Sequence, residues 1–204
     1  MGSRMMHLVI AEQITKRITI TDKADFLLGG IAPDAVSSKD VSHYFVGDES
    51  KFTRRVDFNG FASKYDLGKN TAYIAGYYTH LIADDLWLTG FFSPWLKNRM
   101  ENDNAILELY HNDFRMLNGK LADYYNISQE TVDGLMNNGT PIDLEEVPAK
   151  NVHAFLPYLK GDMNYTKQDL EEPLNVFTLQ QIIGYIETSV ERSVYHLEKI
   201  FRRE

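Results

Sequence analysis

The chain has 204 residues, 44% of them hydrophobic and 25% charged, which suffices for one folded domain with a sizeable core. Its net charge of -8 disfavours a general nucleic-acid or anionic-membrane surface, because both need an excess of Lys and Arg. Without cysteine, disulfides, thiolate zinc sites and cysteine nucleophiles are excluded. Any metal must therefore be held by His, Asp, Glu, backbone or water.

Targeting signals are not evident in the sequence. No run of about 18 uncharged apolar residues predicts a transmembrane helix. The apolar stretch 5–11 is short and contains His7, unlike a signal peptide. We therefore expect a cytoplasmic protein without a transmembrane segment. The first four residues fit a cloning remnant ahead of a natural start at Met5 or Met6.

The N-terminal segment reads as two helices. Apolar residues recur close to every 3.6 positions over 7–18, which predicts an amphipathic helix. Thr21 is typical of the N-cap of a short second helix, and the glycine pair at 29–30 predicts its end. Pro33 and Asp34 are then expected in a loop or at a helix start.

The middle of the chain is predicted to be irregular before a long helix. Residues 36–69 mix small polar residues with isolated aromatics, and we expect an extended excursion with one helix over 59–65. A long apolar helix over about 70–88 follows, and Gly90 and Pro94 are expected to end it.

The C-terminal half also favours helices. One is predicted over 101–118, stopped by Gly119, and another over 128–136, with a serine N-cap. Residues 141–173 are expected to be mostly loop, and a capping box opens a last helix over 178–201. No strand alternation of useful length is present. The prediction is an all-α single domain spanning 1–204.

His80 and Asp84 form the most informative pair in the chain. They are four residues apart in an apolar helix, so their side chains share one face. A buried charge is costly unless it is paired or bound to a metal. The pair therefore suggests two metal ligands, while a plain His–Asp hydrogen bond without metal remains open.

Three further candidate ligands lie upstream of this pair. His7 is on the first helix and His43 follows the loop that carries Asp34. Taken singly, the histidines fit satisfied core or surface residues, and Asp34 fits a plain loop or N-cap residue. Glycine and proline before Asp34 fix a sharp backbone path, which is a way to aim one carboxylate inward.

The chemistry explains why these residue types recur together. Zinc and similar metals accept neutral imidazole and carboxylate. A catalytic metal keeps a position for water and lowers the pKa of that water toward neutrality. One carboxylate can bridge two metals, and Asp84 on the central helix is the natural candidate.

Four sequence blocks carry a resemblance to a known family. They resemble, in order and approximate spacing, the successive blocks of the bacterial zinc-dependent phospholipase C family: Met6-His7-Leu8, Leu28 to Asp34, Ser42-His43-Tyr44-Phe45 and Tyr77 to Trp87. The resemblance covers under half the chain. It implies a helical bundle with a cluster of one to three zinc ions that hydrolyses a phosphodiester with a metal-activated water.

The resemblance also implies roles for individual residues. His7 would be the ligand from the first helix, and Asp34 a metal ligand or the general base. His43 would be the next ligand, and His80 and Asp84 would supply the His-x-x-x-Asp pair.

The sequence departs from the family in two ways. The secreted enzymes use an N-terminal Trp as a ligand, whereas here residues precede His7 and no Trp is near it. The family also has a His-x-x-x-Glu pair, which is absent here. Glu108 and His111 are the nearest substitutes, with Asp113 close by. Fewer metals, or another divalent metal, are compatible with this set.

Other candidate residues favour structural roles. Asp85 is interpreted as a solvated carboxylate or one that orients a histidine ligand. The aromatic run from Trp87 to Trp95 favours core packing over a substrate or lipid wall. His153, expected in a proline-flanked loop, and His196, on the last helix, are taken as structural or surface residues.

These features lead to one main function and two alternatives. The main hypothesis is a metal-dependent hydrolase of phosphate esters, a phospholipase C-like phosphodiesterase, acting on a small-molecule or lipid phosphoester. Helical phosphohydrolases of the His-Asp type need an adjacent His-Asp dipeptide, which the chain lacks. The other alternative is a non-catalytic helical binding or scaffold domain with a degenerate structural metal site. The sequence does not determine the oligomeric state.

Overall fold

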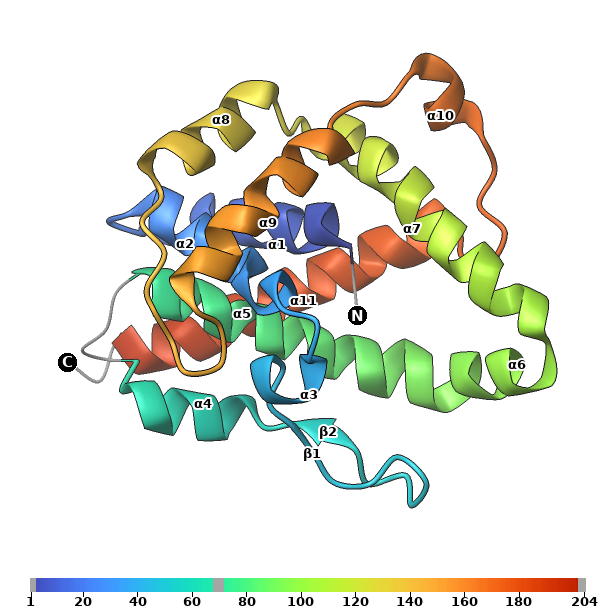
Figure 1. Ribbon diagram of the computed structural model, residues 1–204, viewed down its shortest axis with the longest axis horizontal. Coiled ribbons are helices and arrows are strands. Elements are labelled where there is room, and N and C mark those ends of the chain that lie inside the picture. Colours follow the sequence, from blue (N-terminus) through green and yellow to red (C-terminus); the bar gives the residue numbers. More distant parts are fainter. Residues whose placement is uncertain (1–2, 68–71, 202–204) are drawn as a thin grey trace.

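The computed structural model describes residues 3–67 and 72–201 and is built almost entirely from helices (Figure 1). The long helices of this part of the chain are α1 (Arg4–Thr15), α2 (Lys23–Ile31), α5 (Ala72–Trp87), α7 (Asn104–Tyr125), α8 (Gln129–Asn138), α9 (Ala149–Asp162) and α11 (Leu179–Phe201). Shorter helices are η1 (Ala32–Ala35), α3 (Lys39–Ser42), α4 (Phe58–Tyr65), α6 (Lys97–Asn102) and α10 (Lys167–Glu171). The predicted all-α class is confirmed.

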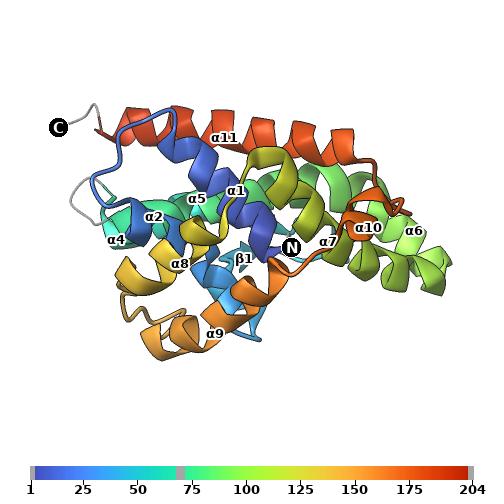
Figure 2. The ribbon, with the colours of Figure 1, turned by 90° about the horizontal axis from the view of Figure 1, so that it is seen from above.

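Helix α5 is the central element of the fold. Nearly all of its side chains are buried, because α2, α1 and α11 pack around it. Figure 2 shows α11 along one face of the molecule and α8 and α9 on the opposite side, with α1, α2 and α5 between them. The apolar side chains of these helices form one shared core.

Glycines let α2 and α5 approach unusually closely. A Cβ built on Gly29 would lie 1.9 Å from the carbonyl oxygen of Tyr73, and one on Gly76 would lie 2.0 Å from that of Phe26. Helix α2 ends at Ile31, one residue after the pair at 29–30 that was predicted to end it. The two glycines lie inside the helix, and they serve the helix–helix contact.

Helix α5 ends at Trp87, close to the predicted end near 88, but Gly90 and Pro94 do not break the chain out of helical structure as expected. The chain continues from α5 through a π-helical segment, η2 (Leu88–Leu96), directly into α6. The π register replaces the i to i−4 hydrogen bonds that a proline disrupts, so Pro94 is accommodated inside the helix. The predicted start of the long helix at residue 70 lies outside the described residues.

Helix α7 runs past Gly119, which was expected to stop it. A Cβ at Gly119 would lie 2.7 Å from the ring of Tyr165, so this glycine makes room for an aromatic side chain. The helix ends at Asn126, which adopts a left-handed conformation typical of a helix C-terminus.

Helix α9 was missed within the predicted loop 141–173. Its buried residues Val152, Leu156 and Leu159 have helical spacing, but Pro157 interrupts the pattern in the sequence. Pro157 is exposed, so water can satisfy the carbonyl group that its missing N–H leaves free.

The irregular excursion of 36–69 is partly ordered into short elements. Strands β1 (Phe45–Val46) and β2 (Arg55–Val56) form an antiparallel hairpin, which projects from the helices in Figure 1. It precedes α4, close to the predicted helix over 59–65.

Two predicted caps are confirmed. The Ser128 hydroxyl accepts from the Thr131 amide, and Thr178 and Gln181 form the reciprocal bonds of a capping box. Within the described part of the chain, none of the helices has both the length and the apolar character needed to cross a bilayer.

The glycine contact predicts a large difference between two Gly→Ala substitutions. We expect Gly76→Ala to lower the free energy of unfolding by roughly 3 kcal/mol, because the new methyl group overpacks the contact with α2. Gly184→Ala on α11 is the control. Its Cβ meets no atom within 4 Å, so we expect a gain of about 0.5–1 kcal/mol from helix propensity. Urea unfolding measures both, and equal effects would contradict this account.

Candidate metal centre

The structure brings together five of the residues predicted to be metal ligands. His7 comes from α1, Asp34 from η1 and His43 from the C-terminal end of α3, while His80 and Asp84 are one turn apart on α5. The three imidazoles and Asp84 are almost completely buried, and the Asp34 side chain is 11% exposed.

The Asp84 carboxylate lies at the centre of the group. Its Oδ1 is 3.4 Å from His7 Nε2, and its Oδ2 is 3.2 Å from His43 Nε2. Oδ2 also lies 3.7 Å from His80 Nε2. The two oxygens thus face different imidazoles, which is the arrangement a bridging carboxylate needs.

His80 is held in the tautomer that suits a metal ligand. Its Nδ1 lies 2.9 Å from the carbonyl oxygen of Gly30, which can only accept a hydrogen bond. The proton is therefore on Nδ1, and Nε2 presents a lone pair to the cluster. Metal-bound histidines commonly donate their second N–H to a backbone carbonyl in this way.

His43 faces His80 directly, nitrogen to nitrogen. The two Nε2 atoms are 3.3 Å apart, and Nδ1 of His43 is 2.8 Å from the Ser42 hydroxyl. Since Nε2 of His80 carries a lone pair, a proton or a cation must lie between the two nitrogens. A metal ion in this position would displace that proton.

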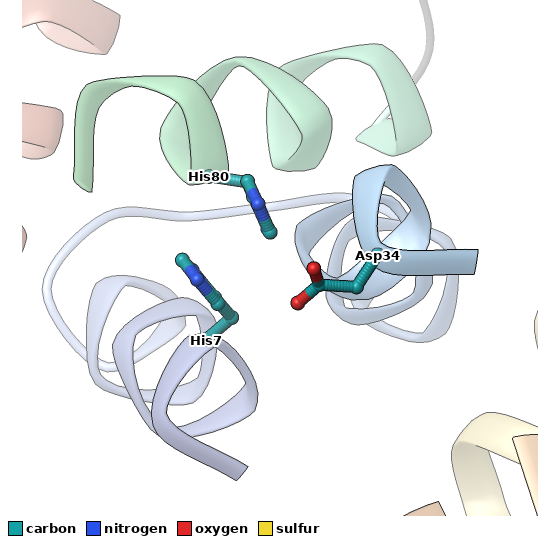
Figure 3. A group of neighbouring side chains, drawn as sticks. All are labelled: His7, Asp34 and His80. Atoms are coloured by element: carbon teal, nitrogen blue, oxygen red, sulfur yellow. The ribbon is translucent and has the colours of Figure 1, made fainter. Parts of the chain in front are cut away.

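His7 has the clearest unmet requirement in the group. Neither of its buried ring nitrogens makes a hydrogen bond of good geometry with a described residue, and the nearest approach is the 3.4 Å between Nε2 and Asp84 Oδ1. Its ring stacks on that of His80 at a centroid distance of 3.6 Å, and Figure 3 shows the Asp34 carboxylate directed toward these two rings. Buried polar atoms without a partner are costly, and a metal ion on His7 would satisfy one of them.

The pKa shifts favour the protonation states that metal ligands need. Burial, together with the neighbouring His7, holds the pKa of His80 well below its ordinary value, so its imidazole is neutral. Burial by itself disfavours ionised Asp34, but the hydrogen bond with His43 and the charge of Lys39 help keep its pKa well below the ordinary value. Neutral imidazole and ionised carboxylate are the metal-binding forms.

Two overlapping groups of three ligands satisfy the geometry of a metal site. His7, Asp34 and His80 form one, and His43, His80 and Asp84 form the other, with the ligand atoms in each group within 4.8 Å of one another. His80 belongs to both, but its Nε2 has a single lone pair and can serve one ion only. The buried His/Asp group can hold a metal ion.

Asp34 connects the buried group to the outside of the protein. Its Oδ1 lies 3.5 Å from His43 Nε2 and 2.7 Å from the ammonium group of Lys39. Asp34 and Lys39 also line a pocket of about 310 Å³ between η1, α7 and α9. A molecule in that pocket would contact Asp34 before any other member of the group.

Glu108 and His111 are not brought into either group. Both are exposed on α7, whereas Asp113, two residues after His111, is fully buried. Two residues correspond to about 200° around a helix, so His111 and Asp113 face opposite directions. The Asp113 carboxylate instead accepts hydrogen bonds from the backbone amides of 175–177 ahead of α11.

The remaining candidates have structural roles. Asp85 points away from the group and lies 3.4 Å from the Arg192 guanidinium. Trp87 is fully buried among other aromatic rings, as expected for core packing. His153 is exposed on α9, in a helix and not in the predicted loop, and His196 hydrogen-bonds Tyr78.

Sequence reasoning missed the residues that surround the ligands. Gly30 contributes a carbonyl oxygen, which no side-chain pattern reveals. Lys39 follows Asp34 by five residues, and only its spacing from the carboxylate could have suggested an ion pair. Arg115 and Asn118 line the same pocket from α7, where the sequence had pointed to Glu108 and His111 instead.

No protein-family model, curated protein or solved structure matches this chain. The geometry of the site is therefore the basis for its function.

The position of His7 predicts that His7→Leu affects stability differently in metal-free and in zinc-loaded protein. In chelator-treated protein the substitution should shift the Tm by only a few degrees, because it removes two nitrogens without hydrogen-bond partners but also the imidazole that lies 3.4 Å from Asp84 Oδ1. A hundredfold excess of zinc over Kd should stabilise the wild type by about 2.7 kcal/mol, or about 5–11 °C. His7→Leu should lose most of this shift.

The control for this experiment is His153→Ala, which changes an exposed histidine outside the group. It should keep the full zinc-dependent shift in a thermal melt. A wild-type Tm that does not respond to zinc, cobalt or manganese would contradict the metal site.

Proposed function

We propose that the protein is a metal-dependent hydrolase of phosphate esters, similar in chemistry to the zinc-dependent phospholipase C family. The observation that carries the proposal is the position of Asp34. It belongs to a buried three-histidine, two-aspartate group and also lines a pocket that a small molecule can enter. A site that only stabilised the fold would not need an acidic ligand facing a pocket.

The ligand set favours zinc and limits the number of ions. Imidazole nitrogens and carboxylate oxygens suit zinc, and cysteine is absent. Since Nε2 of His80 serves one ion, two ions would be held by His80 with His43 and by His7 with Asp34. Asp84 would bridge them through its two oxygens. A third ion would need ligands beyond these five, so we propose one or two ions.

The protein's own groups would perform the remaining steps. Asp34 is ionised and lies at the pocket, so it is placed to accept a proton from the attacking water as general base. Lys39 holds the Asp34 carboxylate by a 2.7 Å ion pair, which fixes its orientation. The metal would act as a Lewis acid on the phosphate oxygens and lower the pKa of the water.

One observation favours a structural metal site in a non-catalytic domain instead. Four of the five candidate ligands have almost no solvent exposure, and structural metal sites are closed, without a position for water. The missing His-x-x-x-Glu pair agrees with this alternative. This alternative predicts that the protein binds a metal ion but does not hydrolyse phosphate esters.

Asp84→Asn tests the proposal through metal content and activity. Protein purified without chelator should contain one or two metal ions per chain by elemental analysis. It should also hydrolyse members of a panel of phosphodiesters and phosphomonoesters. Asp84→Asn should lose most of the metal and lower kcat/KM by about 100-fold or more, because both of its oxygens face ligands.

Asp34→Asn separates catalysis from metal binding. It should lower kcat by about 100-fold or more, the contribution of a general base, while retaining more metal than Asp84→Asn. His111→Ala, on the exposed face of α7, is the control and should keep both metal and activity. Metal without hydrolysis of any ester would favour the structural alternative, and no metal after reloading at neutral pH would exclude both.

A further inference from the structure

The pocket beside Asp34 has a composition that restricts what it can bind. Its lining includes Lys39 next to Asp34, Arg115 and Asn118 from α7, and the rings of Phe114 and Phe155. It therefore offers cations, one amide and two aromatic walls to a molecule in contact with the buried metal group.

The positive charges in the pocket are not balanced by free acids. Asp162 is engaged by the Arg4 guanidinium through two bonds of 2.7 and 2.8 Å, and Asp34 by Lys39. Arg115 forms no ion pair with a described residue; its guanidinium donates to the amide oxygen of Asn112. Arg115 is therefore the lining cation that is available to an anionic group.

Asn118 adds a polar group at the same pocket. Its side chain is only 8% exposed, and its Oδ1 is buried without a hydrogen-bond partner among the described residues. A ligand in the pocket does not reach this buried oxygen. The side-chain nitrogen of Asn118 is not buried in this way, so the amide presents a hydrogen-bond donor to the pocket, which suits an anionic oxygen.

A positively charged organic group has no suitable partner here. Recognition of quaternary ammonium groups relies on aromatic faces free to receive the cation. The Arg4 guanidinium already lies 5.3 Å from the centre of the Phe155 ring, and both lining acids are engaged. A positively charged ligand in this pocket would be repelled by Lys39, Arg115 and Arg4.

We propose that this pocket selects phosphate esters whose organic part carries no positive charge. Arg115 holds the phosphate, and the side-chain amide of Asn118 donates a hydrogen bond to it. This inference deepens the proposed function and rests on it for the identity of the reacting group. Substrate selection depends on pocket residues that are not metal ligands.

Two phosphomonoesters of similar size test the selection. The organic part of glycerol 3-phosphate is uncharged, and phosphocholine carries a quaternary ammonium. Calorimetric titration of the zinc-loaded protein should give a Kd at least about tenfold lower for glycerol 3-phosphate, because the lining cations repel the ammonium group. Asn118→Leu should weaken both esters, because it removes a hydrogen bond to the phosphate.

Arg115→Gln should weaken both esters and inorganic phosphate by roughly tenfold, because it removes a charge-assisted hydrogen bond. Arg99→Gln on α6 is the matched control. Arg99 is also exposed and without an ion pair to a described residue, but it does not line the pocket. The Arg99→Gln variant should bind both esters and inorganic phosphate as the wild type does.

The titrations are run with and without zinc, with metal content measured on each sample. Arg115 and Asn118 line the pocket in either state, so the comparison remains decisive. Tighter binding of phosphocholine, or equal effects of Arg115→Gln and Arg99→Gln, would overturn the inference. If the protein still bound zinc, that result would not contradict the proposed function. A chain that never takes up zinc would overturn the proposed function, even where the preference for glycerol 3-phosphate held.

Discussion

The close contact between α2 and α5 is the constraint on which both the fold and the metal group depend. Gly29 and Gly76 have no Cβ, so the two helix backbones approach to a distance that no other residue permits. This approach places the Gly30 carbonyl against His80 and fixes the proton of that imidazole on Nδ1. The same contact therefore packs the core and points a lone pair at Asp84. Helix packing and ligand chemistry are thus parts of one arrangement.

Local patterns in the sequence predicted the elements whose signals lie within one helix. The spacing of His80 and Asp84 on an apolar helix, the Ser128 cap and the Thr178 capping box all report on neighbouring residues, and the structure contains each. The convergence of His7, Asp34 and His43 on this helix came from the resemblance to a family. Spacing along the chain does not fix how separate helices meet.

The failures at the glycines share one physical cause, which is tertiary packing that overrides a local signal. The glycines at 29–30 and 119 were read as helix ends because glycine has low helix propensity, but each makes room for another segment. Pro94 fits because the helix changes register, and α9 tolerates Pro157 on its exposed side. Glu108 and His111 were chosen by spacing, without knowing which face of α7 is buried. At the glycines the deciding atoms belong to distant residues, whereas the two prolines are accommodated by the helix register and by solvent exposure.

The burial of the imidazoles has a kinetic consequence for any metal in the group. His7, His43 and His80 have essentially no contact with solvent, and Asp34 is tied to Lys39 at the only partly exposed position among the five ligands. An ion can leave only when that ion pair opens or the helices separate locally, so its exchange is coupled to protein breathing and not to affinity alone. A chelator would strip it slowly even where it binds the metal more tightly. The metal found after purification would then be the one that was bound while the chain folded.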